Sequence, residues 1–254
     1  MKYFLLIILS VLLFHCKEVK QDFSEEKQTV QSIIDKTIHV SGVAALADSD
    51  LIFTFRDIRY RAIRSDGKFS LIRMIAKGRD WTVDSLTNTG FTRRFNEKVV
   101  NVPDSMAVKY SASVNSVHYF SVLPYGLNDP AVKKELLEDI LLKNKKYSTI
   151  KVTFKQDGGG EDFEDVFMYW INKETSKIDY LAYSYNEIDG KGIRFREGYN
   201  ERYVQGVRFV DYNNYRPEDG SLSLTELPQL FEIGGLKLLS KIELETITVK
   251  LTQY

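Results

Sequence analysis

The chain has 254 residues, and its 35 Lys and Arg balance its 35 Asp and Glu, so the formal net charge is zero. With no basic stripe on any helical pattern, this balance excludes nucleic acid as an expected partner. Hydrophobic residues make up 43% and charged residues 28%, which is typical of a globular fold, and 5 Pro and 15 Gly exclude a disordered or collagen-like chain.

The first 15 residues are predicted to be a signal peptide. Lys2 gives a positive start, and the run at 3–14 (YFLLIILSVLLF) is too short for a transmembrane helix, which needs about 20 residues. Cys16, the only cysteine, follows at the junction and cannot form an internal disulfide. We therefore expect Cys16 to be lipidated and residues 16–27 to form a polar tether. The bulky His15 departs from the usual small residue, and a plain secretion signal or an uncleaved anchor is the alternative.

Residues 29–46 are predicted to form the first helix, because Val30, Ile33 and Ile34 recur at three- and four-residue spacing. From residue 51 the apolar period becomes two, which indicates short antiparallel strands. The expected strands cover residues 51–56, 60–64, 69–76, 81–86, 91–95 and 98–102.

Pro103 interrupts this series of strands. Residues 108–123 then have helical spacing, although Val, Tyr and Ser are modest helix formers and a strand is the alternative. A shorter helix is expected over residues 129–142, since Asp129 suits a cap and Pro130 the first helical position.

The C-terminal half alternates strand-like runs with turn-rich spacers, which is typical of an antiparallel meander. The expected strands cover residues 147–154, 166–172, 178–185, 193–199, 203–212 and 241–252, with a short helix over 227–233. We predict an α+β fold for residues 28–254, in which a single strongly curved antiparallel sheet, a half-barrel, encloses two main helices.

Three pairs of sequence blocks carry a family resemblance. They are NSVHYF (115–120) with LPYGL (123–127), GGG (158–160) with YWIN (169–172), and IDYLAY (178–183) with RFR (194–196). Together they resemble a family of envelope lipoproteins known only as a domain of unknown function. The likeness covers residues 30–250 and carries no known chemistry, so it implies no catalytic residue.

The expected architecture also resembles, more loosely, the half-barrel of the lipoprotein carrier and acceptor superfamily. That likeness rests on strands wrapped around an early and a central helix, and it is an analogy of fold. It implies a hydrophobic ligand, either a lipid or an acylated protein. The predicted location is the envelope of a Gram-negative-type bacterium, lipid-anchored at the outer membrane.

Aromatic strands carry the predicted binding site. In residues 166–172 and 178–185 both faces are apolar, so one face would pack on the helices and the other could line a cavity for an acyl chain. The alternative is an ordinary core with amphipathic surface tyrosines. The candidate ligand-binding residues are Tyr119, Phe120, Tyr169, Trp170, Tyr180, Arg194 and Arg196.

The two arginines have two possible roles. Arg194 and Arg196 alternate with apolar residues, so they could sit at a cavity mouth and meet an anionic head group. They could instead pair with Glu187 and Glu197 as surface charges. The sequence leaves both open.

Catalysis finds little support in the sequence. After the signal peptide, His39 and His118 are the only histidines, and no Gly-x-Ser-x-Gly motif is present. A hydrolase would need His118 beside a carboxylate in a cleft. We predict no catalytic residue, no cofactor and no zinc site.

One acidic loop could bind a metal ion. Residues 157–165 (DGGGEDFED) offer hard oxygen ligands of the kind that calcium prefers. The spacing does not match the twelve-residue calcium loop, and a flexible hairpin with a solvated acidic tip is the simpler interpretation.

These observations favour a non-catalytic envelope lipoprotein that binds a hydrophobic ligand. The first alternative is a protein or glycan interaction module without a cavity, and a hydrolase is the second. The binding hypothesis predicts an apolar cavity of several hundred Å³ between the sheet and the helix at 108–123, about the size of ordinary ligand pockets.

Overall fold

The computed structural model describes residues 28–157, 163–187 and 190–252. The predicted signal peptide, Cys16 and the tether lie outside the described residues, as do residues 158–162 of the acidic loop. In the described part of the chain, no helix combines the length and the apolar character needed to cross a membrane.

The first elements in the described part of the chain are helix α1 (Val30–Ser41) and the 3₁₀ turn η1 (Val43–Ala47), which together confirm the predicted helical segment. Gly42 separates them with a left-handed φ of 65°. A Cβ at Gly42 would lie 2.1 Å from the carbonyl oxygen of Gly206, so this close approach requires glycine.

Two antiparallel sheets contain all the described strands. The seven-stranded sheet has the order β15-β1-β2-β3-β4-β5-β6. Its strands are β1 (Ser49–Phe55), β2 (Ile58–Ser65), β3 (Lys68–Lys77), β4 (Asp80–Thr87), β5 (Gly90–Phe95), β6 (Lys98–Val100) and β15 (Glu245–Leu251).

The eight-stranded sheet has the order β14-β13-β12-β11-β10-β9-β7, and β8 also pairs with β9. Its strands are β7 (Val132–Leu136), β8 (Ile140–Leu142), β9 (Lys145–Phe154), β10 (Val166–Asn172), β11 (Ile178–Glu187), β12 (Gly190–Val204), β13 (Val207–Arg216) and β14 (Lys237–Ile242).

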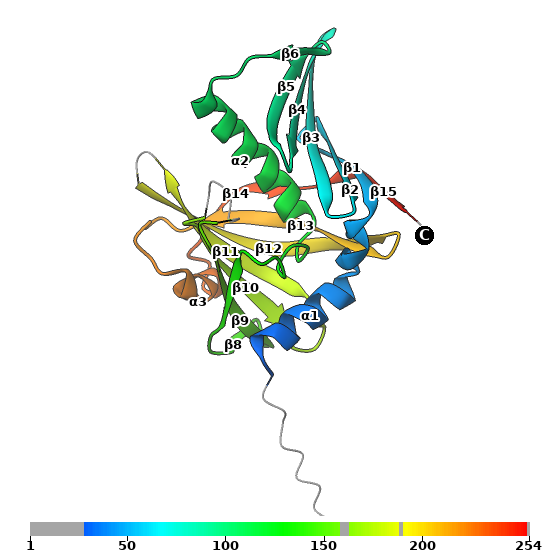
Figure 1. Ribbon diagram of the computed structural model, residues 1–254. Coiled ribbons are helices and arrows are strands. Elements are labelled where there is room, and N and C mark those ends of the chain that lie inside the picture. Colours follow the sequence, from blue (N-terminus) through cyan, green and yellow to red (C-terminus); the bar gives the residue numbers. More distant parts are fainter. Residues whose placement is uncertain (1–27, 158–162, 188–189, 253–254) are drawn as a thin grey trace, which may run out of the picture.

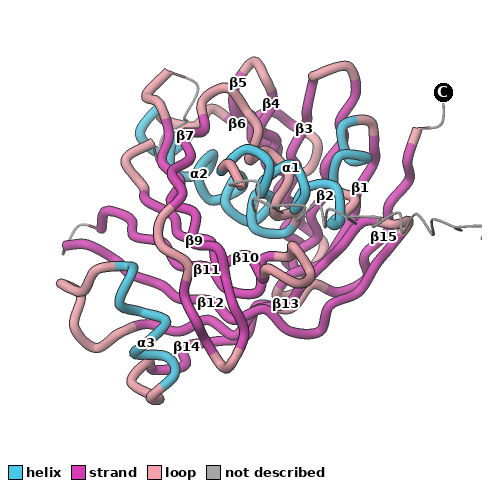
Figure 2. Tube along the Cα trace, turned by 90° about the horizontal axis from the view of Figure 1, so that it is seen from below, coloured by secondary structure: helices cyan, strands magenta, loops and turns pink. Residues whose placement is uncertain are grey.

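Both sheets curve around α1 and α2 (Asp104–Ser121), whereas α3 (Leu227–Glu232) lies outside the curve (Figures 1 and 2). The predicted α+β class and the antiparallel half-barrel around two main helices are confirmed. The ladder is not one continuous sheet as expected, however. Between β14 and β15 the backbone amide of Leu244 donates to the side chain of Asp211 instead of to a neighbouring strand.

The predicted helix over residues 129–142 is wrong. Residues 132–136 and 140–142 are strands β7 and β8, and both pair with β9. Asp129 and Pro130 form a turn instead of a helix start, and the amide of Val132 donates to the carbonyl of Asp129 at 2.9 Å. Sheet pairing therefore outweighs the local helix signal.

Three other expected boundaries differ. The strand expected over 203–212 includes the turn at Gln205 and Gly206 and is divided between β12 and β13. The last strand, expected over 241–252, is divided between β14 and β15. The turn expected at 200–202 is instead a bulge within the long strand β12, where the register with β13 shifts between Tyr199 and Arg202. A bulge bends the strand without ending it.

Buried side chains cover both faces of β10 and β11, as the sequence pattern predicts. Phe167, Tyr169 and Ile171 pack in one cluster with α1 and the end of α2. Trp170 and Tyr180 pack on the opposite face in a cluster that includes Leu227 and Phe231 of α3. A third cluster joins the seven-stranded sheet to η1 and α2.

Candidate ligand-binding cavity

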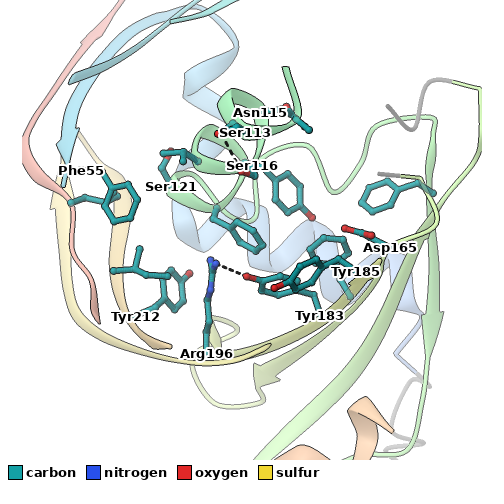
Figure 3. A pocket seen from close by; sticks show the side chains of 18 of the residues that line it. Phe55, Ser113, Asn115, Ser116, Ser121, Asp165, Tyr183, Tyr185, Arg196 and Tyr212 are labelled. Carbon is teal, nitrogen blue, oxygen red and sulfur yellow. Dashed lines mark hydrogen bonds between the residues drawn. The ribbon is translucent and has the colours of Figure 1, made fainter. Parts of the chain in front are cut away.

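A cavity of about 670 Å³ lies between α2 and the concave face of the eight-stranded sheet (Figure 3). We call it the ligand cavity. Its position and size are those that the binding hypothesis predicted, within the usual range for ligand pockets.

Successive residues of a helix point in directions about 100° apart, so only part of the surface of α2 borders the ligand cavity. Val114 is buried in the cluster of the seven-stranded sheet. Val117 and Phe120 border the ligand cavity, while Ser111 and His118 face the opposite flank. The helix is thus held by one sheet and walls a space above the other.

Aromatic and aliphatic side chains form most of the wall. The Phe120 ring centroid lies 5.0 Å from that of Tyr183 and 6.0 Å from that of Phe167, so α2 and strands β10 and β11 meet through their rings. The apolar lining comprises Phe55, Val117, Phe120, Phe154, Phe167, Val210, Ile242 and Leu244. Tyr119, Tyr183, Tyr185 and Tyr212 complete it with apolar rings that carry a hydroxyl.

Polar side chains mark the opening. Asn115 on α2 and Glu164 and Asn186 across the cavity are exposed lining residues, and Asn186 Nδ2 donates to Glu164 Oε2 at 3.0 Å. Asp165 lines the same side. The mouth therefore carries two carboxylates and amide groups.

Arg196 forms the floor of the ligand cavity. It lies on β12, near the middle of the sheet, and Figure 3 shows it pointing towards α2. Its side chain is 7% exposed, and its guanidinium carbon lies 3.9 Å from the centroid of the Phe120 ring. Nη2 donates to the Tyr183 hydroxyl at 2.7 Å.

The remaining donors of Arg196 have no acceptor. Nε and Nη1 are buried and make no hydrogen bond. No carboxylate among the described residues forms an ion pair with Arg196. A buried cation with unused N–H groups is costly, and an acceptor that reached these groups would reduce the cost.

Two tyrosine hydroxyls meet beside the cavity. The oxygens of Tyr119 and Tyr169 are 2.5 Å apart, which joins α2 to β10. Burial raises the pKa of both phenols above their usual value. Burial also raises the pKa of Tyr212, so these hydroxyls remain protonated hydrogen-bonding groups at neutral pH.

The structure brings together five of the seven candidate residues on the concave side. Tyr119, Phe120 and Arg196 line the ligand cavity, and Tyr169 lies directly behind it. The Arg194 guanidinium carbon lies 5.3 Å from the ring centroid of the lining residue Tyr185.

Trp170 and Tyr180 do not join that group. Both belong to the cluster beneath α3, on the other face of the sheet. Glu197 lies on that face as well, where Lys143 donates to it at 3.0 Å, so the suggested surface pair between Glu197 and Arg196 does not form. The side chain of Glu187 lies outside the described residues.

Sequence reasoning missed several lining residues. Tyr183 and Tyr185 share a face of β11, and Tyr183 is directly paired with Arg194 in the neighbouring strand. Alternate residues of a strand share a face, so pairing the face of the two arginines with the neighbouring strand would have identified Tyr183 and Tyr185. Phe55 and Leu244 carried no such signal, because they come from the other sheet and the connection between sheets.

A second cavity of about 780 Å³ lies against the opposite flank of α2. It is bordered by Arg64, which is buried, stacks on Tyr125 at 4.8 Å and has no acceptor for Nη1. Burial lowers the pKa of Arg64. The two cavities share Ala112, Asn115, Tyr119 and Phe154 in their linings.

His118 also borders the second cavity. Its Nε2 lies 3.2 Å from the carbonyl oxygen of Ile72, and its ring packs edge-on against Phe53 and Tyr60, each with centroids 5.6 Å apart. Burial lowers the pKa of His118 to about 3, so the imidazole is neutral. The hydrolase hypothesis required a carboxylate beside His118; its ring contacts instead a carbonyl and two aromatic rings.

Among the described residues, no three His, Cys, Asp or Glu side chains converge as metal ligands would. Glu161 and Asp162, two of the candidate calcium ligands in the acidic loop, lie outside the described residues.

Known proteins can now be compared with this geometry. A family model described as "Family of unknown function (DUF6503)" matches residues 2–244. The chain belongs to this family. The match confirms the predicted membership of a family of unknown function, and it includes every residue that lines the ligand cavity of this DUF6503 protein.

Two solved structures resemble the DUF6503 chain. A DUF1329 family protein from Desulfovibrio piger has 10% identity and a TM-score of 0.49, covering 89% of this chain and 95% of its own. A putative outer membrane lipoprotein-sorting protein domain from Vibrio parahaemolyticus has 8% identity and a TM-score of 0.39, covering 85% and 92%. Both resemble this chain only distantly, in the path of the backbone. Among curated proteins, none matches the chain in sequence.

Proposed function

We propose that this DUF6503 protein binds a hydrophobic ligand, a lipid or an acylated protein, without catalysing a reaction. The observation that carries this proposal is the ligand cavity of about 670 Å³, walled by rings and aliphatic side chains between α2 and the sheet. Each methylene group that moves from water into such a wall contributes about 0.8 kcal/mol, so an acyl chain would bind well there.

The wall of the ligand cavity is continuous with the buried core. Phe167, Val210 and Tyr212 belong to the cluster beneath α1, and Leu244 belongs to the cluster of the seven-stranded sheet. Phe120 and Tyr183 pack against the first of these clusters, are only partly buried and contact Arg196 beside open space. These half-buried rings around a buried cation support a ligand.

Membrane anchoring is the second part of the proposal. A diacylated Cys16 and a tether over residues 16–27 would hold the domain at the outer membrane of a Gram-negative-type envelope. The support is the apolar run at 3–14 and the lone cysteine that follows it. Mass spectrometry of the N-terminal peptide from envelope-extracted protein tests this part, and an unmodified or internal Cys16 would contradict it.

An interaction module for protein or glycan remains the alternative function. Its support lies at the far end of the seven-stranded sheet, where Trp81, Phe95 and Val99 are 43%, 46% and 68% exposed. Exposed apolar side chains of this size are typical of contact surfaces. This alternative leaves the ligand cavity without a role.

A cavity-filling variant tests the main proposal. Val117 lines only the ligand cavity and Ser111 only the second one, so Val117→Trp and Ser111→Trp place the same ring on opposite flanks of α2. We expect the full chain to bind a fluorescent sixteen-carbon amphiphile, Val117→Trp to lose that binding, and Ser111→Trp to keep it. Absence of binding by the unaltered protein, or equal binding by both variants, would contradict the proposal.

A further inference from the structure

We infer that the ligand of this cavity is a single-chain amphiphile with a terminal carboxylate, and that the carboxylate enters first and binds Arg196. This inference rests on the proposed function and deepens it, because it specifies the chemical class of the ligand and its direction. It follows from three observations on Arg196 and on the cavity mouth.

The first observation is the state of the Arg196 donors. Nη2 is used by Tyr183, but Nε and Nη1 are buried, face no acceptor and belong to a residue that lines the cavity. An arginine binds carboxylates more strongly than neutral acceptors, since both partners are charged. A ligand carboxylate would satisfy the unused N–H groups.

The second observation is how Phe120 covers the guanidinium. The guanidinium carbon lies 3.9 Å from the centroid of the Phe120 ring and 5.0 Å from that of the Tyr183 ring, and these two centroids are 5.0 Å apart, so both rings lie on the same side of the cation. The hydrogen-bond donors of a guanidinium point outwards in its plane. The Phe120 ring and the Tyr183 hydroxyl therefore restrict the orientation of Arg196, and Nε and Nη1 keep their N–H groups unused.

The third observation is the charge of the mouth. Glu164 and Asp165 line the opening, whereas Arg196 lies on the floor. An anionic head group held at the mouth would meet these carboxylates, and an uncharged chain would not. The charge distribution thus favours the head group on the floor and the hydrocarbon chain towards the mouth.

This orientation distinguishes between the two ligands proposed above. The acyl chain of an acylated protein is attached through an ester or amide, so only its methyl end could reach the floor. Arg196 would then face a hydrocarbon with its donors still unused. A free long-chain carboxylate satisfies the same donors and buries its chain against the same wall.

The test compares palmitic acid with hexadecanol, which have the same chain length, by calorimetry on the full chain at pH 8. We expect the acid to bind at least about tenfold more tightly, the ratio expected for a hydrogen bond to a charged group. Arg196→Met should abolish this preference, so that the acid and the alcohol bind the variant with equal affinity. Arg194→Met, two residues along the same face, should keep it.

The outcomes separate the two proposals. If acid and alcohol bind the unaltered protein equally, the carboxylate inference is wrong and hydrophobic binding stands. If neither binds, the proposed function itself is wrong.

A second measurement needs no variant. The carboxyl ¹³C resonance of labelled palmitate bound to the unaltered protein should stay in its ionised position to a lower pH than in free micelles. Titration of the bound carboxyl like the free one would overturn the inference, even if Arg196→Met fails to fold.

Discussion

The carboxylate of Asp211 accepts a hydrogen bond from the backbone amide of Leu244, with 2.9 Å between Oδ1 and N. Asp211 is on β13, and Leu244 is in the short connection between β14 and β15. Arg202 donates to the same carboxylate at 3.0 Å and to the Leu244 carbonyl at 2.5 Å. A buried side chain therefore takes over from the backbone ladder where the chain leaves one sheet and enters the other.

Removing this junction should weaken the whole domain. Asp211→Ala leaves the Leu244 amide without its acceptor and the Arg202 guanidinium without its counter-charge, and we expect a loss of about 3 kcal/mol in the free energy of unfolding. Hydrogen exchange at the Leu244 amide should accelerate strongly. Glu243→Ala is the control, because Glu243 directly precedes Leu244 but is exposed. This variant should lose less than about 1 kcal/mol in the free energy of unfolding. Unchanged exchange at Leu244 in Asp211→Ala would refute this account.

A second prediction concerns Asp84, which is fully buried between two arginines. Arg93 Nε donates to Oδ1 at 2.6 Å and Arg73 Nη2 to Oδ2 at 2.6 Å, across neighbouring strands. Asp84→Asn should lower the free energy of unfolding by about 3–5 kcal/mol, because buried Arg73 and partly buried Arg93 lose their counter-charge. Asp50→Asn, in the more exposed pair with Arg61, should cost less than about 1 kcal/mol.

The ion pairs of Asp84 with Arg73 and Arg93 also make the free energy of unfolding depend on pH. Burial alone would raise the pKa of Asp84, but the hydrogen bonds from Arg93 and Arg73 outweigh it and hold that pKa below the ordinary 3.8. The stabilisation is therefore complete above pH 3.8 and is lost as the pH falls through the lower folded-state value. Urea unfolding should show the gap between the unaltered protein and Asp84→Asn narrowing only below pH 3.8. A gap that closes already at pH 6 would contradict the assignment.

A third prediction follows from the neutral, buried His118. Its pKa is about 3 when folded and 6.5 in an ordinary environment, so between these values only the unfolded state binds the proton. The free energy of unfolding should therefore fall by about 1.4 kcal/mol per pH unit as the pH drops from 6.5 towards 3. His118→Gln cannot titrate and should remove this one-proton slope, measured by urea unfolding between pH 7 and 4.5. Parallel pH profiles of the two proteins would show that His118 is accessible to protons.

The fourth prediction compares two glycines in contact. Gly42 and Gly206 both have positive φ, but a Cβ meets the Gly206 carbonyl at 2.1 Å only when it is added to Gly42. Gly206→Ala should cost about 1–2 kcal/mol from the left-handed conformation alone. Gly42→Ala adds a backbone clash and should lower the melting temperature clearly further. Equal melting temperatures would mean that η1 moves away from the β12–β13 hairpin at little cost.

Strand positions were the part of the fold most open to prediction. Period-two alternation located strands β9 to β11, because those strands are apolar on alternate or on both faces, but it ran one expected strand through the turn between β12 and β13. The helix expected over 129–142 failed because β7 pairs with β9, and a window of local sequence contains no information on a partner strand. The Asp211–Leu244 junction was equally invisible, since it depends on a contact between distant residues.

The candidate site was predicted in part for the same reason. Arg196 and Phe120 were chosen from chemistry and spacing, and they meet at 3.9 Å. Trp170 and Tyr180 were chosen from strands whose two faces are equally apolar, so the pattern could not tell which face encloses the cavity. In the structure the six-residue helix α3 covers the face that carries Trp170 and Tyr180, so the cavity lies on the opposite face.

Strand β1 lies between β2, its neighbour in sequence, and β15, which leaves the ribosome after every other described element. Leu51 pairs with Val249, so the seven-stranded sheet acquires its closing strand only after the eight-stranded sheet has been synthesised. Contacts between such distant segments form late and slowly. The seven-stranded sheet of a growing chain therefore lacks this edge strand until synthesis has passed β15, and until then β1 presents an unpaired edge.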